Sequence, residues 1–332
     1  SIAYLSDGTQ VTANQPRFEQ GKFGKALLIE ENTTNLLTAN QSSVETDLTG
    51  FTRNGDSTLT RDTTTAWHGV ASIKTIASTS NAGWYIQVPG GNVPRNTTYT
   101  ASLYVKGAGQ INVALYHNAG IAPLQRITVN LKTDWQRVIV TGTTRDEDYP
   151  LRLYVRSSDG AAEWYADGIQ VEQKPYVTSF IDGTRAAETL AIPTEGVLNP
   201  QEGTVEFWAK VNSLRDWGCL LQSYVSSPGA TDRFAIYYDA NGSLQYEIAG
   251  YNVRYASPNG TLQIGNWAFI AMAWRNGTLY AYFNGQLLGT ASPGVDATIG
   301  SILRIGHSAQ EQQMNGLIDD LRISSRALTD EE

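Results

Sequence analysis

Asn266–Thr290 reads NWAFIAMAWRNGTLYAYFNGQLLGT, and these residues indicate the fold class of the chain. Its Asn276-Gly277 dipeptide predicts a hairpin turn, because both central residues of a type I′ turn need a positive φ. Asn284-Gly285 predicts a second tight turn eight residues later. The stretch is therefore expected to hold two β-strands joined at the first turn, with the chain reversing again at the second.

The two strands differ in how many of their faces are apolar. On the first, both faces are apolar, which is typical of a strand in the middle of a two-layer β structure; the faces carry Trp267, Phe269 and Ala271, and Ile270, Met272 and Trp274. The second alternates, as a strand covered on one side does, with Leu279, Ala281 and Phe283 opposite Tyr280 and Tyr282. The pair predicts the core of a β-sandwich.

Length and composition set the class of protein. At 332 residues the chain suggests two domains, and its 31 Gly and 17 Tyr suit short strands with tight turns. A net charge of −8 argues against nucleic acid or an anionic membrane as partner, and no apolar run approaches the ~20 residues of a membrane span.

The single cysteine, Cys219, is expected to be a buried small hydrophobe. No signal peptide is visible, although the chain opens at Ser1 without Met.

Residues 35–180 carry dense strand signals and no helical period. About eight strands are expected there, which favours an antiparallel sandwich or jelly roll; they include GWYIQVPG, YTASLYVKG, INVALYH, RITVNL, WQRVIVTGTT, LRLYVRSS and EWYADGIQVEQ. A connection punctuated by Gly and Pro follows Lys174-Pro175-Tyr176 as far as Glu202, and a second β series then runs toward the C-terminus.

The C-terminal region resembles the laminin-G-like, concanavalin A-like lectin sandwich. The resemblance is carried by GTVEFWAKV (Gly203–Val211), the opening stretch and NGLIDDLRISSRALTDEE (Asn315–Glu332). GKFGKALLIE (Gly21–Glu30) resembles the first strand of that family, in which first and last strands are neighbours. The resemblance implies one discontinuous domain formed by 1–34 and 181–332.

The intervening residues, 35–180, resemble the family 4/9 carbohydrate-binding jelly roll through NLLTAN, HGVASIKT (His68–Thr75), WQRV and YADGIQVEQ. The expected fold class is all-β, with two antiparallel β-sandwich (jelly-roll) domains, one inserted in the other. The combination of NQPRF, LLIEENTTNLL and SFIDGTRAAE resembles minor structural proteins of bacteriophage virions and prophages, where it recurs in tail and surface-fibre components.

The residues that catalysis would need are not gathered in the sequence. The three histidines are scattered, no Gly-x-Ser-x-Gly elbow occurs, and no strand of the lectin-like region carries the paired carboxylates of a glycosidase. The chain is therefore predicted not to be an enzyme, which disfavours a polysaccharide depolymerase.

Aromatic and planar polar residues on the outward face of the jelly roll are the candidate glycan site, because rings stack on sugar faces and planar groups bond hydroxyls. The candidates are Tyr85, Tyr104, Asn112, Tyr116, Arg152 and Tyr154. The alternative is that this face packs on the other domain or on a partner chain. A second candidate rim in the C-terminal domain consists of Trp217, Tyr224, Tyr251 and Tyr255.

The jelly-roll resemblance also implies a structural Ca²⁺, held by the carboxylate that aligns with Asp167 in YADG. The acidic residue expected in the first strand of the family is not evident in NLLTANQSS. Asp319 or Asp320 would serve similarly in the lectin-like domain; the alternative is that one of this pair caps a turn and the other faces solvent.

These observations predict a non-catalytic glycan-binding and adhesion protein on a phage or prophage-derived particle, attaching to bacterial surface polysaccharide. It is expected on the virion surface or outside the cell, among other virion proteins, with a homo-oligomer left open. The alternative is a structural or capsid/tail decoration protein whose sandwiches make protein–protein contacts without a sugar ligand.

Overall fold

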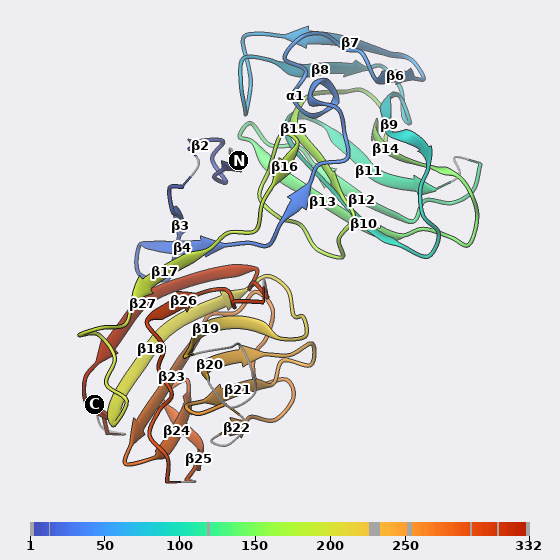
Figure 1. Ribbon diagram of the computed structural model, residues 1–332. Helices are drawn as coiled ribbons and strands as arrows, with labels where there is room; N and C mark the ends of the chain where they lie inside the picture. The colour runs from blue at the N-terminus through green and yellow to red at the C-terminus, as the bar shows by residue number, and fades with distance from the viewer. Residues whose placement is uncertain are drawn as a thin grey trace. The chain divides into compact units, whose positions relative to one another are not determined.

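The computed structural model of the chain describes residues 3–12, 14–117, 120–225, 233–250, 254–292, 294–310 and 312–329. Strands dominate these residues, and the predicted all-β fold class is confirmed (Figure 1). No helix in the described ranges has the length and apolar character needed to cross a membrane. Contacts divide the chain into two units: the first holds the described residues of Ser1–Ala13 and Thr33–Arg185, and the second those of Asn14–Asn32 and Ala186–Glu332.

The first unit is a sandwich of two antiparallel sheets. The sheet that we call the Tyr85 sheet has the order β12 (Gln125–Asn130), β11 (Gln110–His117), β14 (Pro150–Ser157), β9 (Gly83–Asn92) and β6 (Phe51–Asn54). The sheet that we call the Tyr104 sheet has the order β13 (Gln136–Thr143), β10 (Thr98–Ala108), β15 (Ala162–Glu172), β8 (Ser72–Ala77) and β7 (Ser57–Asp62). Their inward faces enclose one core, which includes Trp84 of β9, Leu103 of β10 and Val113 of β11.

A short helix, α1 (Ala39–Ser43), interrupts the strands of the first unit. No helix is expected here from the sequence, which shows no helical period. Thr38 and Gln41 form a capping box, in which each side chain satisfies the other residue's backbone N–H group, and this local signal fixes one helical turn.

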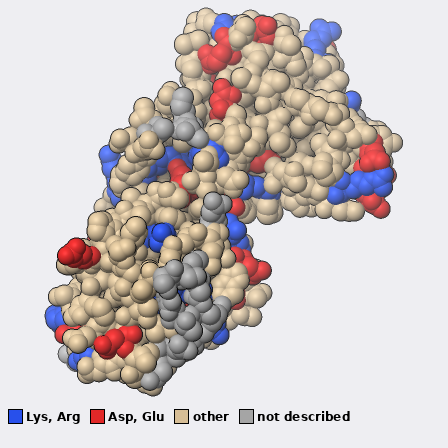
Figure 2. Space-filling view, in the orientation of Figure 1, with Lys and Arg blue, Asp and Glu red and all other residues tan. Residues whose placement is uncertain are grey.

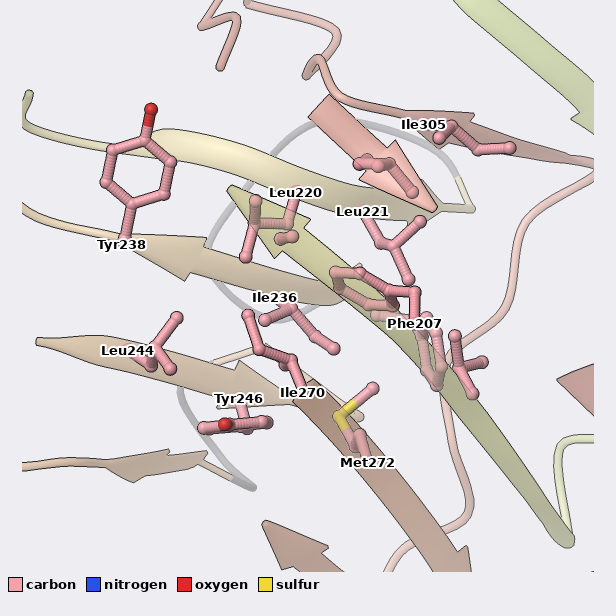
Figure 3. Close-up of a cluster of buried hydrophobic side chains, with 14 of the residues drawn as sticks. Phe207, Leu220, Leu221, Ile236, Tyr238, Leu244, Tyr246, Ile270, Met272 and Ile305 are labelled. Atoms are coloured by element: carbon pink, nitrogen blue, oxygen red, sulfur yellow. The ribbon is translucent and has the colours of Figure 1, made fainter. Parts of the chain in front are cut away.

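The second unit is also a two-layer antiparallel sandwich. Its six-stranded sheet has the order β17 (Leu190–Pro193), β26 (Ile302–Ile305), β19 (Gly218–Tyr224), β20 (Arg233–Tyr238), β21 (Leu244–Glu247) and β22 (Arg254–Ala256). Its seven-stranded sheet has the order β25 (Gln286–Ala291), β24 (Thr278–Phe283), β23 (Ala268–Arg275), β18 (Glu202–Val211), β27 (Gly316–Ser324), β4 (Lys25–Ile29) and β3 (Arg17–Gln20). Figure 3 shows side chains of both sheets meeting in the core, among them Phe207, Ile236 and Met272.

The two Asn-Gly turns of the opening stretch are confirmed. Asn276 and Gly277 have φ of 50° and 71°, and Asn284 and Gly285 have φ of 50° and 78°, as type I′ turns require. β23 pairs with β18 on one side and β24 on the other, so the strand that is apolar on both faces lies inside its sheet. Cys219 is fully buried, as predicted, and burial raises the pKa of its thiol.

The pairing of the first strand with the last is confirmed, because β4 lies against β27 with Ile29 opposite Gly316. After β4 the chain passes into the main part of the first unit at β5 (Thr33–Thr34) and leaves it at β16 (Thr184–Arg185), and these two strands pair with each other. An insertion needs such neighbouring entry and exit points.

Residues 3–12 lie with the first unit, whereas all of 1–34 was predicted to belong to the second. The short strands β1 (Ala3–Tyr4) and β2 (Gln10–Val11) pair with each other. The Tyr4 ring packs 4.3 Å from the His68 ring and 5.4 Å from the Phe180 ring, centroid to centroid. Residues 3–12 are too few to form a core of their own, so they pack on an apolar surface of another part of the chain. Here that surface belongs to the jelly roll.

Candidate functional site

A row of three tyrosines crosses the outward face of the Tyr85 sheet. Tyr116, Tyr154 and Tyr85 come from β11, β14 and β9, which are adjacent strands. The Tyr85 and Tyr154 rings stack with centroids 4.8 Å apart, and the Tyr116 ring meets Tyr154 edge-on at 4.9 Å. The first distance matches the spacing of neighbouring strands, because strand pairing places Tyr85 directly opposite Tyr154, whereas Tyr116 is a diagonal neighbour of Tyr154.

The register explains why the three rings meet. Tyr154 lies opposite Tyr85 on one side and opposite Ala114 on the other, and the small Ala114 side chain leaves room for the Tyr116 ring to lean toward Tyr154. Tyr154 is therefore 7% exposed at the centre of the row. Tyr85 and Tyr116 remain half-buried and present the aromatic surface that a ligand could reach.

Planar polar groups flank the row. The Arg152 guanidinium lies 5.2 Å from the Tyr85 ring centroid, and its Nε donates to Gln87 Oε1 at 3.0 Å. The Arg156 guanidinium lies 4.5 Å from the Tyr154 centroid, and its Nη2 donates to the Tyr116 hydroxyl at 3.0 Å. Cation–π contacts of this kind attract a guanidinium to the face of a ring.

Asn112 completes the set, since it lies opposite Arg156 and accepts a 2.8 Å hydrogen bond from the Thr128 hydroxyl. Five of the six predicted glycan-site residues thus share one face: Tyr85, Asn112, Tyr116, Arg152 and Tyr154. Such a face offers ring surfaces for stacking and donors and acceptors for hydroxyl groups.

Tyr104 does not belong to this face. Its strand, β10, pairs with β13 and β15 in the other sheet. There the Tyr104 ring stacks on Trp67 with centroids 3.6 Å apart and planes at 10°, and Tyr104 is 5% exposed. Alternation along a strand separates inward from outward residues, but it does not tell which of two sheets the strand joins.

Gln87 and Arg156 were missing from the predicted site. Both could have been found from the sequence, because Gln87 lies two residues after Tyr85 and Arg156 lies two residues after Tyr154. Residues two apart on a strand share a face.

Asp167, a predicted calcium ligand, is fully buried and bonded to backbone N–H groups. Its Oδ2 accepts from Trp67 and His68, each at 2.8 Å, and its Oδ1 accepts from Gly168 at 2.7 Å. Calcium needs about 6–8 oxygen ligands around the ion. Three N–H dipoles directed at both carboxylate oxygens present positive charge where a cation would sit, so this site does not fit calcium.

Asp319 and Asp320 do not fit calcium either. Asp319 Oδ2 accepts from the backbone N–H groups of Lys22 and Phe23 at 2.8 and 2.9 Å, and so holds the turn between β3 and β4. Asp320 is exposed and pairs with Arg322 at 2.7 Å. The alternative assignment, one residue bonding a turn and the other facing solvent, describes this pair. Among the described residues, no group of three or more His, Cys, Asp or Glu is placed to hold a metal ion.

The second candidate rim is not assembled. Trp217 and Tyr224 stand at opposite ends of β19, whose seven residues span ~20 Å. The Tyr255 hydroxyl donates to the backbone oxygen of Leu288 at 2.8 Å and its ring packs near Tyr246. Tyr251 lies outside the described residues. The aromatic row of the Tyr85 sheet is thus the stronger candidate site.

Charge is sparse over the molecule, as its 17% of charged residues predicts. Figure 2 shows that most of the surface turned toward the viewer is neither basic nor acidic. A weakly charged polar surface suits contact with neutral hydroxyl-rich ligands and does not by itself select one.

Two family models match the chain. Residues 35–167 match a carbohydrate binding domain (CBM_4_9), and residues 182–332 match the concanavalin A-like lectin/glucanases superfamily (Laminin_G_3). These matches confirm the two domain resemblances found in the sequence. No curated protein matches the chain.

Solved structures match parts of the chain at low identity. The CBM22-1 xylan-binding domain of Paenibacillus barcinonensis Xyn10C is 20% identical and covers 44% of this chain and 98% of its own, with a TM-score of 0.36. Domain 4 of the arabinanase AbnA of Geobacillus stearothermophilus, in complex with arabinotriose, is 23% identical over 47% and 77%, with a TM-score of 0.36. The CBM40 of Ruminococcus gnavus IT-sialidase, bound to α2,3 sialyllactose, is 15% identical over 40% and 79%, with a TM-score of 0.33.

Proposed function

We propose that the protein binds glycan without acting on it, and that its first unit holds the sugar on the outward face of the Tyr85 sheet. The observation that carries this proposal is the row Tyr85–Tyr154–Tyr116, with Arg152, Arg156 and Asn112 beside it. Rings that stack on sugar faces and planar groups that bond hydroxyls are the two components that such a site needs. The match of residues 35–167 to a carbohydrate binding domain supports the same function.

The biological setting that we propose is a phage or prophage-derived particle. The protein would lie on the virion surface, or otherwise outside the cell, among other virion proteins, and attach the particle to a bacterial surface polysaccharide. This part of the proposal rests on the sequence combination NQPRF, LLIEENTTNLL and SFIDGTRAAE. Immunogold labelling of purified particles with an antibody against the chain tests it; labelling of the surface is expected, and unlabelled particles that contain the chain's gene would contradict it.

A glycan array tests the binding itself. The wild type is expected to bind a subset of bacterial polysaccharides, and the double variant Tyr85→Ala/Tyr116→Ala is expected to lose ~10-fold or more in affinity, because each ring supplies stacking surface. The matched control is Tyr165→Ala. Tyr165 is a half-buried, outward tyrosine of the other sheet with Lys74 5.5 Å from its ring.

Two results would contradict the proposed function. One is an absence of binding to any glycan at millimolar concentration. The other is binding that the Tyr85→Ala/Tyr116→Ala variant and the Tyr165→Ala variant change equally. If the face is also found buried against other copies or other particle proteins, the protein is instead a structural or decoration component.

A further inference from the structure

The five strands of the Tyr85 sheet contain no acidic residue. Their sequences are FTRN, GWYIQVPGGN, QINVALYH, QRITVN and PLRLYVRS. The chain as a whole has 32 Asp and Glu against 24 Lys and Arg, and strands of the opposite sheet carry Asp62, Glu163, Asp167 and Glu172. The candidate face therefore departs from the acidic balance of the protein.

Three arginines stand at outward positions of this sheet. Arg152 and Arg156 lie on β14, two residues to either side of Tyr154. Arg126 lies on β12, opposite Ala114 of β11. Arg126 is exposed, and the other two are half-buried. A cluster of one sign on a face raises the local concentration of ligands of the other sign.

Neutral groups hold two of these guanidiniums. The hydrogen bonds described for Arg152 and Arg156 run to the Gln87 side chain and the Tyr116 hydroxyl. No ion pair joins either residue to a carboxylate within the ranges that the structure describes. By contrast, Arg95 pairs with Asp148, Arg233 with Glu247 and Arg322 with Asp320.

Each of these two guanidiniums has N–H donors beyond the one in its hydrogen bond. A guanidinium carries five N–H groups, and each of the two arginines uses one in the bonds above. Contact with the Tyr85 and Tyr154 rings restricts both side chains before a ligand arrives, so less rotational freedom is lost on binding. A planar fork of N–H donors is the partner that a carboxylate bonds in bidentate fashion.

We propose that the glycan held here is acidic, with carboxylates on its sugar rings as in a uronic-acid polymer. This inference rests on the proposed function and specifies its ligand class. Sugar rings stack on Tyr85 and Tyr116, and a ring carboxylate bonds the Arg152 or Arg156 guanidinium. A neutral glycan would leave these guanidiniums without an anionic partner and would gain only the stacking and hydroxyl contacts.

Calorimetric titration of the full chain with paired polymers tests this inference. The probes are polygalacturonate and hyaluronan, each compared with the same polymer after its carboxyl groups have been reduced to alcohols. The acidic forms are expected to bind about tenfold or more tightly, the factor of one charge-assisted hydrogen bond, and to weaken as salt is raised.

Arginine variants locate the effect. Arg152→Gln and Arg156→Gln are expected to bring the acidic polymers close to the affinity of their reduced forms, and Arg152→Lys to recover part of the loss because it keeps the charge. The matched control is Arg95→Gln, which removes the same charge from an exposed cluster with Asp146 and Asp148 and should leave the difference unchanged.

The outcomes separate this inference from the proposed function. Reduced polymers that bind as well as acidic ones, with both lost in Tyr85→Ala/Tyr116→Ala, would overturn the acidic ligand and keep glycan binding. Acidic binding that Arg152→Gln, Arg156→Gln and Arg95→Gln all lower equally would also overturn it, since net charge alone would then explain the affinity. No binding to any form of polymer or to any glycan of the array would overturn both.

Discussion

The Asp167 carboxylate accepts a hydrogen bond from the backbone N–H of Trp67, 2.8 Å away and a hundred residues earlier in the chain. The same oxygen binds the N–H of His68. Through these bonds β15 holds the loop whose Trp67 ring stacks on Tyr104. The family resemblance implies that Asp167 is a metal ligand, but in this structure its carboxylate bonds the loop at Trp67 and His68 without an intervening ion.

Stability of the first unit is expected to depend on the protonation of Asp167. Burial raises the pKa of this carboxyl from its ordinary 3.8 to about 7, and the three N–H bonds oppose the shift. Between about pH 4 and pH 7 the folded state then binds more protons than the unfolded state, so this group's contribution to the free energy of unfolding falls as pH rises. The fall is on the order of 4 kcal/mol at most.

Denaturant titrations at a series of pH values, comparing wild type with Asp167→Asn, measure this contribution as a difference. The excess stability of the wild type is expected to decline from pH 4 to pH 7. Asp56→Asn, at an exposed position, should follow the wild type throughout. A wild type and Asp167→Asn that keep a constant difference across this range would refute the prediction.

Asp319→Ala is expected to destabilise the second unit by about 2–4 kcal/mol, because the N–H groups of Lys22 and Phe23 lose their acceptor in a partly buried turn. Thermal unfolding followed by calorimetry measures the loss. The neighbouring control is Asp320→Asn, which removes an exposed ion pair with Arg322 and should cost less than about 1 kcal/mol. Equal losses from the two variants would show that the turn does not depend on Asp319.

The two glycines of the Asn-Gly turns should differ in their tolerance of alanine. Both have positive φ, so either substitution strains the backbone by about 1 kcal/mol. At Gly277 a Cβ would also lie 2.6 Å from the Gly294 carbonyl carbon, whereas nothing lies within 4 Å at Gly285. Gly277→Ala is therefore expected to lower the unfolding midpoint clearly more than Gly285→Ala. The opposite order would mean that the Gly294 backbone yields freely.

Calcium is expected to leave the stability of both units unchanged. Asp167 and Asp319 direct their oxygens at N–H groups, and Asp320 pairs with a guanidinium. A structural site filled at a hundred times its dissociation constant would add about 2.7 kcal/mol. Unfolding midpoints in millimolar calcium and in excess chelator should coincide, and a higher midpoint in calcium alone would establish a site that these contacts do not show.

Much of the candidate site could be predicted from alternation along single strands. Side chains on a strand alternate between its two faces. On β9, Trp84 and Ile86 face the core, so Tyr85 and Gln87 face outward. On β14, Leu153 faces the core, so its neighbours Arg152 and Tyr154 face outward. The same alternation places Arg156 on the outward face, since Val155 faces inward, although Arg156 was not among the predicted site residues.

Alternation along β10 does not predict which residues surround Tyr104. Its outward direction on β10 was predicted, but its neighbours were not, since β10 pairs with strands that begin near residues 136 and 162. The alternation of side chains along one strand does not show which distant strands will pair with it.

The strands, their inward faces, the two Asn-Gly turns and the two domain resemblances can be predicted from the residues alone, because each depends on residues close together in the chain. The three-dimensional fold is needed to show which strands share a sheet, and so which tyrosines form a row and which is buried. It also directed the oxygens of Asp167 and Asp319 at N–H groups far away in the sequence. Hydrogen bonds between strands that are distant in the sequence determine which sheet each strand joins. The alternation of side chains along one strand is compatible with either sheet.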